Sequence, residues 1–382
     1  MIKKIVLINQ ATGYLFIDIA NEFALKYDEV VLLTGIVFPM RQPLNPKIKV
    51  VKIKRYIRKS TFTRLICWLV AFIQISFLIK LRYRKHELFI SSNPPFAPLL
   101  PLFCSNPASL LIYDIYPDAL ISGKFLTQKS YIIKRWRDWN RIAYTKISNI
   151  ITLTNGMSEL ISRYTTDQSK ITVIPAWSNE GIVSNNATQY KNKFIEKYNL
   201  QNKFLVVYSG NLGKEHELEA LIYLAKQMTD NLFVQFLIVG EGWKREQLEE
   251  LIKKLILKNC LLLPKQGTEL FEEMTKAMNL GVVSLGRETS KISIPSKTYN
   301  ILSSGKPLLC IGSKDSDLAE LISKYQIGGT FHSDEINEMT EFIELLCGIQ
   351  NPVYKGLCQR ARKTSLLFTS DNARKIVELV TF

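Results

Sequence analysis

Residues 282–312 read VVSLGRETSKISIPSKTYNILSSGKPLLCIG, and this stretch decides the fold. An apolar run that ends at Leu285 is typical of a buried strand, and a polar loop follows it. Ser296 opens a helical pattern that stops at Gly305, and residues 307–311 form a second apolar run. Strand, loop, helix and strand in this order build parallel sheets covered by helices, so the stretch predicts an α/β fold.

The start of the predicted helix is a candidate anion site. A helix N-terminus leaves backbone N–H groups unpaired, and its dipole favours a bound anion. We expect Ser296 to cap the helix and Lys297 to place a positive charge beside the anion. A phosphate group is the natural occupant, and an ordinary capped helix with a solvated lysine is the alternative.

The same alternation of strands and helices occurs in two successive parts of the chain. Its 382 residues exceed one typical core, so we expect two domains, each with a parallel, doubly wound sheet. A polar stretch without apolar periodicity, residues 178–187, marks the boundary. The predicted segments are a first domain at 1–178, a linker at 179–202, a second domain at 203–355 and a closing helix at 356–382.

Glycines and polar residues follow several predicted strands at the edge where parallel sheets bind ligands. In YSGNLGK, residues 208–214, Gly210 and Gly213 would let backbone N–H groups approach a phosphate, which Lys214 can neutralise. This turn is expected at the same sheet edge as the candidate anion site, and His216 lies beside it. Two anion-binding corners therefore converge.

The first half offers two further candidates. Gly13 lies in a loop between a strand and a helix, where a ligand can approach the backbone closely. Asp114 directly follows the predicted strand 110–113, at the sheet edge where ligands bind, and is therefore a candidate catalytic residue. The alternative is an aspartate that only caps the loop.

The cysteine and histidine pattern argues against a metal site or a disulfide framework. The six cysteines form no Cys-x-x-Cys pair, and the three histidines are widely separated. Asp317 and Glu320 are expected to form a capping box rather than to bind a metal. The first apolar run is too short for a signal peptide, so we expect a cytosolic protein in a reducing compartment.

The positive charge is concentrated in one region. The net charge is +16, and residues 30–86 contain no Asp or Glu but thirteen Lys and Arg. Within this region the run 65–79 is apolar and shorter than the roughly 20 residues that span a bilayer. Segment 41–85 therefore favours shallow insertion into an anionic membrane face, with a buried core helix as the alternative. No nucleic-acid-binding motif accompanies the charge.

Several motifs together resemble glycosyltransferase family 4, above all the bacterial surface-polysaccharide branch that includes fucosaminyl transferases. They are YSGNLGK at 208–214, FLIVGEG at 236–242, IPSKTYN at 294–300 and SGKP at 304–307, preceded by DIYPD at 114–118 and KITVIP at 170–175. The resemblance covers nearly the whole chain. It implies the GT-B architecture, with two Rossmann-like domains facing across a cleft and the last helix returning to the first domain.

The resemblance also implies a reaction. A retaining, metal-independent enzyme would move an amino or deoxy sugar from a UDP-sugar, the donor substrate, to a polyprenyl-diphosphate-linked saccharide in capsule or O-antigen synthesis. The first domain would bind the acceptor at the cytoplasmic side of the plasma membrane, and the second would bind the nucleotide sugar, without any cofactor. The candidate catalytic residues are Asp114, Lys214 and Lys297, and the candidate nucleotide-sugar-binding residues are Gly13, Gly210, Asn211, Gly213, His216, Lys265, Arg287, Ser296 and Asn300.

The chain departs from the family pattern at several positions. The usual pair of glutamates is replaced by Ile292 and Asn300, and the usual Arg and Lys after the first strand of the second domain fall at Asn211 and His216. Asp114 stands where many members have a histidine. A catalytically silent subunit that binds nucleotide or membrane is therefore the alternative function. A dinucleotide oxidoreductase is disfavoured, because neither domain has Gly-x-Gly-x-x-Gly with a later acidic residue.

Overall fold

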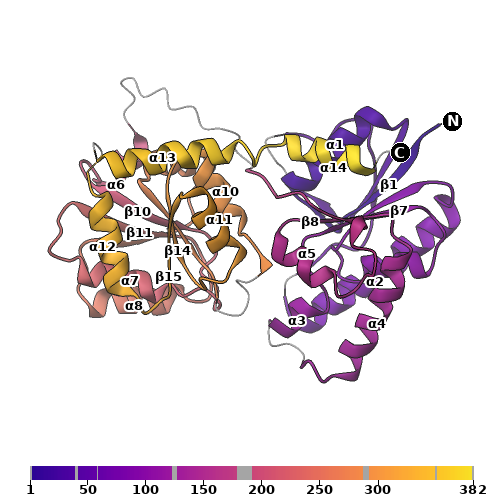
Figure 1. The fold of residues 1–382 in the computed structure, drawn as a ribbon, viewed down its shortest axis with the longest axis horizontal. Helices are drawn as coiled ribbons and strands as arrows, with labels where there is room; N and C mark the ends of the chain where they lie inside the picture. Colours follow the sequence, from indigo (N-terminus) through magenta and orange to yellow (C-terminus); the bar gives the residue numbers. More distant parts are fainter. Residues whose placement is uncertain are drawn as a thin grey trace. The chain divides into compact units, whose positions relative to one another are not determined.

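The computed structural model describes residues 2–38, 42–57, 59–122, 127–178, 192–286, 292–348 and 351–380. The chain divides into two compact units, Met1–Asn179 with Ser370–Phe382, and Glu180–Thr369. Each unit contains one large parallel sheet with helices on both faces (Figure 1). The predicted α/β fold with two Rossmann-like sheets is confirmed.

The sheet of the first unit has seven strands, and every neighbouring pair is parallel. Its central strands are continuous runs of Val, Ile and Leu, because helices cover both faces and no side of the strand meets water. The strand order is β5 (Lys49–Lys52), β3 (Glu29–Thr34), β1 (Lys4–Ile8), β6 (Glu87–Ser91), β7 (Ala108–Ile112), β8 (Asn149–Thr152) and β9 (Ile171–Val173).

Helices and short elements complete this unit. The last helix, α14, packs beside α1 (Figure 1). Lys26 and Glu378 form an ion pair at 3.7 Å between these two helices. The elements are β2 (Ala11–Thr12), α1 (Tyr14–Lys26), β4 (Ile36–Val37), α2 (Thr61–Arg82), η1 (Ala97–Leu102), α3 (Asp118–Ser122), α4 (Tyr131–Thr145), α5 (Asn155–Ile161), η2 (Gln168–Lys170) and α14 (Asp371–Val380).

The sheet of the second unit has six parallel strands. The strand order is β12 (Cys260–Leu263), β11 (Val234–Val239), β10 (Phe204–Ser209), β13 (Leu280–Ser284), β14 (Leu308–Ile311) and β15 (Gly328–Phe331). The surrounding helices are α6 (Lys193–Tyr198), α7 (Glu219–Gln227), α8 (Arg245–Lys254), α9 (Thr268–Ala277), α10 (Ser296–Ser303), α11 (Asp317–Tyr325), α12 (Ile336–Leu346) and α13 (Pro352–Ser365).

The strand order places a ligand crevice in each unit. In both sheets the chain runs outward in one direction from the first strand and then returns to its other side, between β1 and β6 and between β10 and β13. The loops that leave these two strands diverge at their carboxyl ends, which is where open α/β sheets bind ligands. The sequence motifs after β1, β6, β10 and β13 therefore lie at these crevices.

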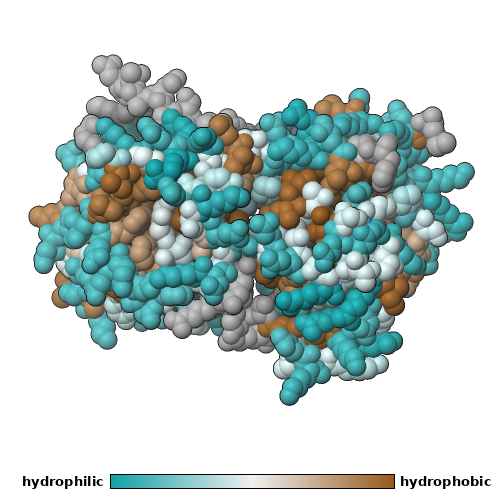
Figure 2. All heavy atoms as spheres, viewed as in Figure 1, coloured by the Kyte–Doolittle hydropathy of each residue, from teal (hydrophilic) through white to brown (hydrophobic). Residues whose placement is uncertain are grey.

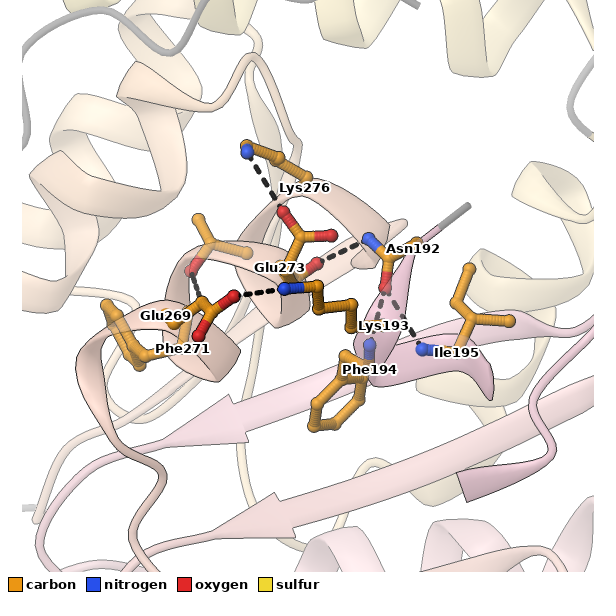
Figure 3. Close-up of polar contacts among 9 residues, drawn as sticks. Asn192, Lys193, Phe194, Ile195, Glu269, Phe271, Glu273 and Lys276 are labelled. Atoms are coloured by element: carbon orange, nitrogen blue, oxygen red, sulfur yellow. Dashed lines mark hydrogen bonds and ion pairs between the residues drawn. The ribbon is translucent and has the colours of Figure 1, made fainter. Parts of the chain in front are cut away.

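The domain boundaries differ from the predicted ones at two places. Asn192 caps α6, which packs on α9: its Oδ1 accepts from the backbone N–H groups of Phe194 and Ile195 at 3.0 Å, and its Nδ2 donates to the Glu273 carbonyl at 2.8 Å (Figure 3). An ion pair between Lys193 and Glu269 adds a second link (Figure 3). Residues from Asn192 onward thus belong to the second unit rather than to a linker.

The closing helix predicted at 356–382 is two helices. The first of them, α13, packs on α10 and stays with the second unit, and only residues from Ser370 join the first unit. The break follows α13 at Leu366, after which a short turn leads to α14. The returning segment is therefore shorter than predicted.

Candidate functional site

In the second unit, the loops that follow β10 and β11 are in close backbone contact. The Gly210 N–H donates to the Val239 carbonyl at 2.9 Å, and the Leu212 N–H donates to the Glu241 carbonyl at 2.9 Å. Gly240 has a φ of +152°, and a Cβ there would lie 1.9 Å from the Gly210 carbonyl oxygen. Only glycine allows this approach, so the turn after β10 is held in place by backbone contacts.

Lys297 lies directly against this turn. Its Nζ is 3.9 Å from the centroid of the Tyr208 ring, and a Cβ at Gly210 would lie 2.9 Å from the same atom. The ammonium is buried, and within the described part of the chain it has no hydrogen-bond partner. Burial lowers the pKa of Lys297 from 10.5 to about 8. A buried cation that lacks a counter-ion among the described residues is suited to binding an anion.

The N-terminus of α10 faces the same edge without a side-chain cap. The prediction that Ser296 caps the helix is wrong: Ser296 is the first helical residue, and Pro295 is the cap. Proline fixes its own φ and takes the extended cap position, but its ring offers no oxygen to the first N–H groups. The first turn therefore keeps the dipole and donors that bind anions.

His216 comes from the loop before α7 and contacts the end of β13. Its Nδ1 lies 2.9 Å from the Ser284 carbonyl oxygen, and since a carbonyl only accepts, Nδ1 carries the proton. Burial, and then the charge of Lys297, lower the pKa of His216, so the ring is neutral at neutral pH. Neutral His216 therefore presents a lone pair at Nε2, which lies 3.7 Å from the Glu215 carboxylate.

Lys244, which the sequence did not single out, holds the loop that contains His216 in place. Its Nζ donates to the His216 carbonyl at 2.6 Å and to Glu219 Oε2 at 2.7 Å. Its backbone N–H donates to the Leu212 carbonyl at 2.9 Å. The position of Lys244 in the sequence could have indicated its role, because it follows FLIVGEG at the end of the neighbouring strand β11.

The other predicted residues of the second unit are spread along the edge formed by the carboxyl ends of its strands. Lys214 is exposed, and its Nζ is 4.2 Å from the ring centroid of Trp243, so its charge is directed at that ring. Asn211 is exposed beside Gly213, and Asn300 lies one turn after Lys297 in α10. Lys265 is exposed after the edge strand β12, two strands from β10. Arg287 lies outside the described residues.

The first unit contains a cavity of about 380 Å³ at the carboxyl ends of its strands. Gly13 and Asp114 both line it, so the structure brings these two predicted residues together. The side chain of Ser92 accepts from the N–H groups of Tyr113 and Asp114 at 2.9 and 3.1 Å, which fixes the turn after β7. The protein around Asp114 desolvates its carboxyl group and raises its pKa.

Three aromatic rings from separate segments also line this cavity. The rings of Tyr56 and Trp68 are stacked, with centroids 5.9 Å apart, and Tyr116 meets Trp68 edge-on at 6.1 Å. No Lys or Arg is found among the described residues that line the cavity. The cavity can therefore stack the apolar face of a small ring and pair hydroxyl groups with Asp114.

The acidic residues do not gather into a ligand cluster. Among the described residues, no group of three or more His, Cys, Asp and Glu is placed to hold a metal ion. The predicted capping box at Asp317 is wrong in register, because Ser316 caps α11 and its Oγ accepts from the Ala319 N–H at 3.1 Å. Serine is as good a cap as aspartate, and it precedes Asp317.

Helix α2 is longer than the apolar run 65–79 suggested. It has 22 residues, and by length and composition it could cross a membrane, although a core helix of a soluble protein passes the same test. A narrow stripe packs on the unit, while only 22% of the most apolar window is buried. The buried stripe contains Cys67, Ala71, Ile75 and Ile79, and the exposed face contains Phe62, Leu65, Ile66, Leu69, Ile73, Phe77 and Leu81.

The exposed apolar side chains of α2 form a continuous face. On the face shown in Figure 2, hydrophobic side chains lie in separate patches among hydrophilic ones, as is usual for protein surfaces. The exposed residues of α2 instead follow one another along a single helix. A face of this kind marks an interaction site.

Known proteins resemble the chain in sequence and in fold. Residues 190–364 match the family Glycosyl transferases group 1. WbjE of Pseudomonas aeruginosa, which is named a glycosyltransferase, is 22% identical over 283 residues, covering 71% of this chain and 69% of WbjE. WcaI of Escherichia coli (strain K12), whose name assigns it to colanic acid biosynthesis, is 23% identical over 188 residues; these are 49% of this chain and 46% of WcaI, so the match spans about half of each.

The fold is also found in a solved structure that contains a nucleotide. The crystal structure of Anabaena Alr3699/HepE in complex with UDP superposes with a TM-score of 0.71 at 14% identity, over 98% of both chains. The family match covers the unit that holds Lys297 and the turn after β10. Residues 190–364 therefore resemble a Glycosyl transferases group 1 domain, and the chain is a glycosyltransferase with the GT-B fold.

Proposed function

We propose that this glycosyltransferase moves a sugar from UDP to a lipid-linked saccharide during synthesis of a bacterial surface polysaccharide such as a capsule or O-antigen. We expect an N-acetylated amino sugar or a deoxy sugar, transferred with retention, as in glycosyltransferase family 4. The names of WcaI and WbjE support the class of product, and the UDP in the HepE structure supports the nucleotide.

The observation that carries the donor assignment is the buried ammonium of Lys297. A UDP-sugar carries two charges on its diphosphate, and the turn after β10 together with the start of α10 offers one buried cation and a helix dipole to pair with them. When the sugar leaves, negative charge develops on the diphosphate. Donors that are already in place stabilise that charge without rearranging, so Lys297 would act in the reaction as well as in binding.

Metal independence is part of the proposal. The same Lys297 and helix N-terminus would supply the positive field that a divalent cation supplies in other transferases. Lys214 can add a second charge only if it leaves the Trp243 ring, where it is exposed to solvent. We therefore assign Lys297 the main role and Lys214 a supporting one.

We place the acceptor sugar in the cavity of the first unit. The Tyr56 and Trp68 rings provide a stacking face, and Asp114 can accept a hydrogen bond from the attacking hydroxyl group. Because the pKa of Asp114 is raised, its carboxylate is a stronger base than an ordinary aspartate and takes up a proton more readily. Asp114 would orient and deprotonate the acceptor.

We propose that α2 holds the protein on the cytoplasmic face of the plasma membrane. Its exposed face is apolar, and cations flank it on both sides, including exposed Lys59 and Lys80. The stripe that begins at Cys67 packs on the protein, so the helix would lie in the plane of the membrane rather than cross it. Each cation near an anionic surface contributes about 1 kcal/mol.

Two measurements test this function. Release of UDP from a panel of UDP-sugars, with and without membrane lipids, identifies the donor and shows whether a lipid acceptor is needed. Co-sedimentation with vesicles of phosphatidylglycerol and phosphatidylcholine tests the membrane contact. Replacing Ile73 and Phe77 with Gln should release the protein from these vesicles and leave UDP-sugar hydrolysis unchanged, and wild-type protein that stays in the supernatant at low salt would refute the membrane part.

A further inference from the structure

We infer that Arg64 of α2 binds the diphosphate of a prenyl-linked acceptor, between the aromatic cavity that takes the sugar and the exposed apolar face that takes the lipid. The inference rests on the proposed function, because it assumes that the acceptor is a lipid-linked saccharide. It adds the residue that recognises the charged link between sugar and lipid.

The cavity itself is less suited to a diphosphate than to a sugar. Its described lining contains the carboxylate of Asp114 and no Lys or Arg, so a phosphate group inside would face a like charge and no cation. A prenyl-diphosphate saccharide would therefore keep its sugar in the cavity and its diphosphate outside. The diphosphate needs a cation at the rim.

Arg64 lies at that rim. It is four residues before Trp68 in α2, so both side chains project from the same face of the helix. Its charge acts on the hydroxyl group of Tyr116, where it partly opposes the rise in pKa that burial causes. Trp68 and Tyr116 both line the cavity, and on these two relations we place Arg64 at its edge.

The guanidinium of Arg64 is also incompletely paired. Its Nε is buried, and no hydrogen-bond partner for this atom is found in the described part of the chain. A buried donor without a partner costs about 1–3 kcal/mol, so a ligand that accepts a hydrogen bond from Arg64 would offset this cost. The other cations of this region, such as Arg55 and Lys59, are exposed to solvent and need no partner.

The lipid has an adjoining surface on the same helix. Leu65 and Leu69 flank Trp68 in sequence and are each 49% exposed, and Ile73 and Phe77 continue their face. A prenyl chain that leaves a diphosphate at Arg64 would meet these side chains at once. A single helix therefore contacts all three parts of the acceptor, namely sugar, diphosphate and lipid.

Titration with geranyl diphosphate tests this inference, because this soluble probe carries the diphosphate and a short prenyl chain but no sugar. Saturating UDP is included so that the probe cannot occupy the nucleotide site. We expect saturable binding to wild type, and binding about tenfold or more weaker to Arg64→Gln. Geraniol, which lacks the phosphates, should bind both proteins equally.

A matched control separates Arg64 from the general positive field. Lys80 is exposed on the same helix, 16 residues and about 24 Å further along. Lys80→Gln removes the same charge and should bind geranyl diphosphate within about twofold of wild type. Arg64→Lys should recover part of the loss, and unchanged circular dichroism and melting temperature will show that the variants are folded.

Two results would overturn the inference. One is the absence of saturable geranyl diphosphate binding to wild type, and the other is equal weakening by Arg64→Gln and Lys80→Gln, which would make the effect one of the overall charge. Neither depends on UDP binding. A protein that does not bind UDP, in contrast, would refute the proposed donor.

Discussion

Replacing Lys297 with Met should weaken nucleotide binding while making the free protein more stable. Methionine keeps the aliphatic part of the side chain and removes the ammonium. A charge-assisted contact to a diphosphate contributes about 1.5–3 kcal/mol, so the affinity for UDP should fall about 10- to 150-fold. A lysine whose role is only structural would give the opposite change in stability.

The expected gain in stability follows from the pKa of Lys297. Burial lowers this pKa from 10.5 to about 8, and at about 1.36 kcal/mol per pH unit the charged form costs about 3 kcal/mol in the folded protein. The cation–π contact with Tyr208 offsets about 0.5–2 kcal/mol of this cost. The net gain on removing the charge at pH 7 is therefore about 1–2.5 kcal/mol.

The lowered pKa of Lys297 also determines how this difference in stability changes with pH. Below about pH 8 Lys297 is protonated in both the folded and the unfolded protein, so the full cost is present. As the pH rises from about 8 to 10.5, the folded protein loses the proton first, and the cost disappears. The stability difference between Lys297→Met and wild type should therefore shrink over this interval.

Calorimetric titration with UDP and thermal unfolding measure the two effects. Lys306→Met is the matched control, because Lys306 also has a pKa lowered by burial but lies before β14, at the opposite end of α10 from Lys297. It should leave UDP affinity unchanged. Wild-type UDP affinity in a folded Lys297→Met protein would refute the role of Lys297.

Four further outcomes are expected. Wild-type affinity for UDP should fall as the pH rises above about 8, where Lys297 loses its proton, whereas Lys297→Arg should keep its affinity up to pH 9, as titrations at each pH will show. Gly240→Ala should destabilise the protein by about 2–4 kcal/mol and weaken UDP binding, because its Cβ meets the Gly210 carbonyl, while Gly267→Ala, with nothing within 4 Å, should be nearly neutral in thermal unfolding. Glu215→Gln should strengthen UDP binding about two- to fivefold, because it removes a partly exposed negative charge beside the anion site; weaker binding would contradict this. Treatment with EDTA should leave donor turnover intact, and activity that returns only with Mn²⁺ or Mg²⁺ would refute metal independence.

Much of the fold could be predicted from local sequence patterns. The strands β1, β3, β10 and β13 are continuous apolar runs, and such runs between helical segments indicate a parallel sheet without any tertiary information. The glycines after β10 also carried a readable signal, because a tight turn between a strand and a helix limits the choice of residues. The confirmed predictions are therefore those that depend on neighbours in sequence.

The parts of the site that depend on neighbours in space could not be predicted. Tyr56, Trp68 and Tyr116 come from three separate segments, and nothing in the sequence shows that their rings meet. The bonds from Lys244 to His216 and Glu219 likewise join different loops. Adjacent cap candidates such as Ser316 and Asp317 have similar propensities, so the structure decides between them.

The burial of α2 is a second feature that could not be predicted from the sequence. Its apolar composition is compatible with a core helix, a membrane-bound helix and a membrane-crossing helix. Only the contacts of one narrow stripe, spaced every four residues from Cys67 to Ile79, show that most of its apolar surface is left uncovered by the first unit. A sequence gives the periodicity of a helix but not the number of its neighbours.

Transfer of labelled sugar from a panel of UDP-sugars into the lipid fraction of a membrane extract tests the central claim most directly. We expect that one UDP-sugar releases UDP as label moves into lipid that organic solvent extracts, and that Lys297→Met loses both signals together. The absence of UDP release across the whole panel, or release of UDP without any labelled lipid, would contradict it.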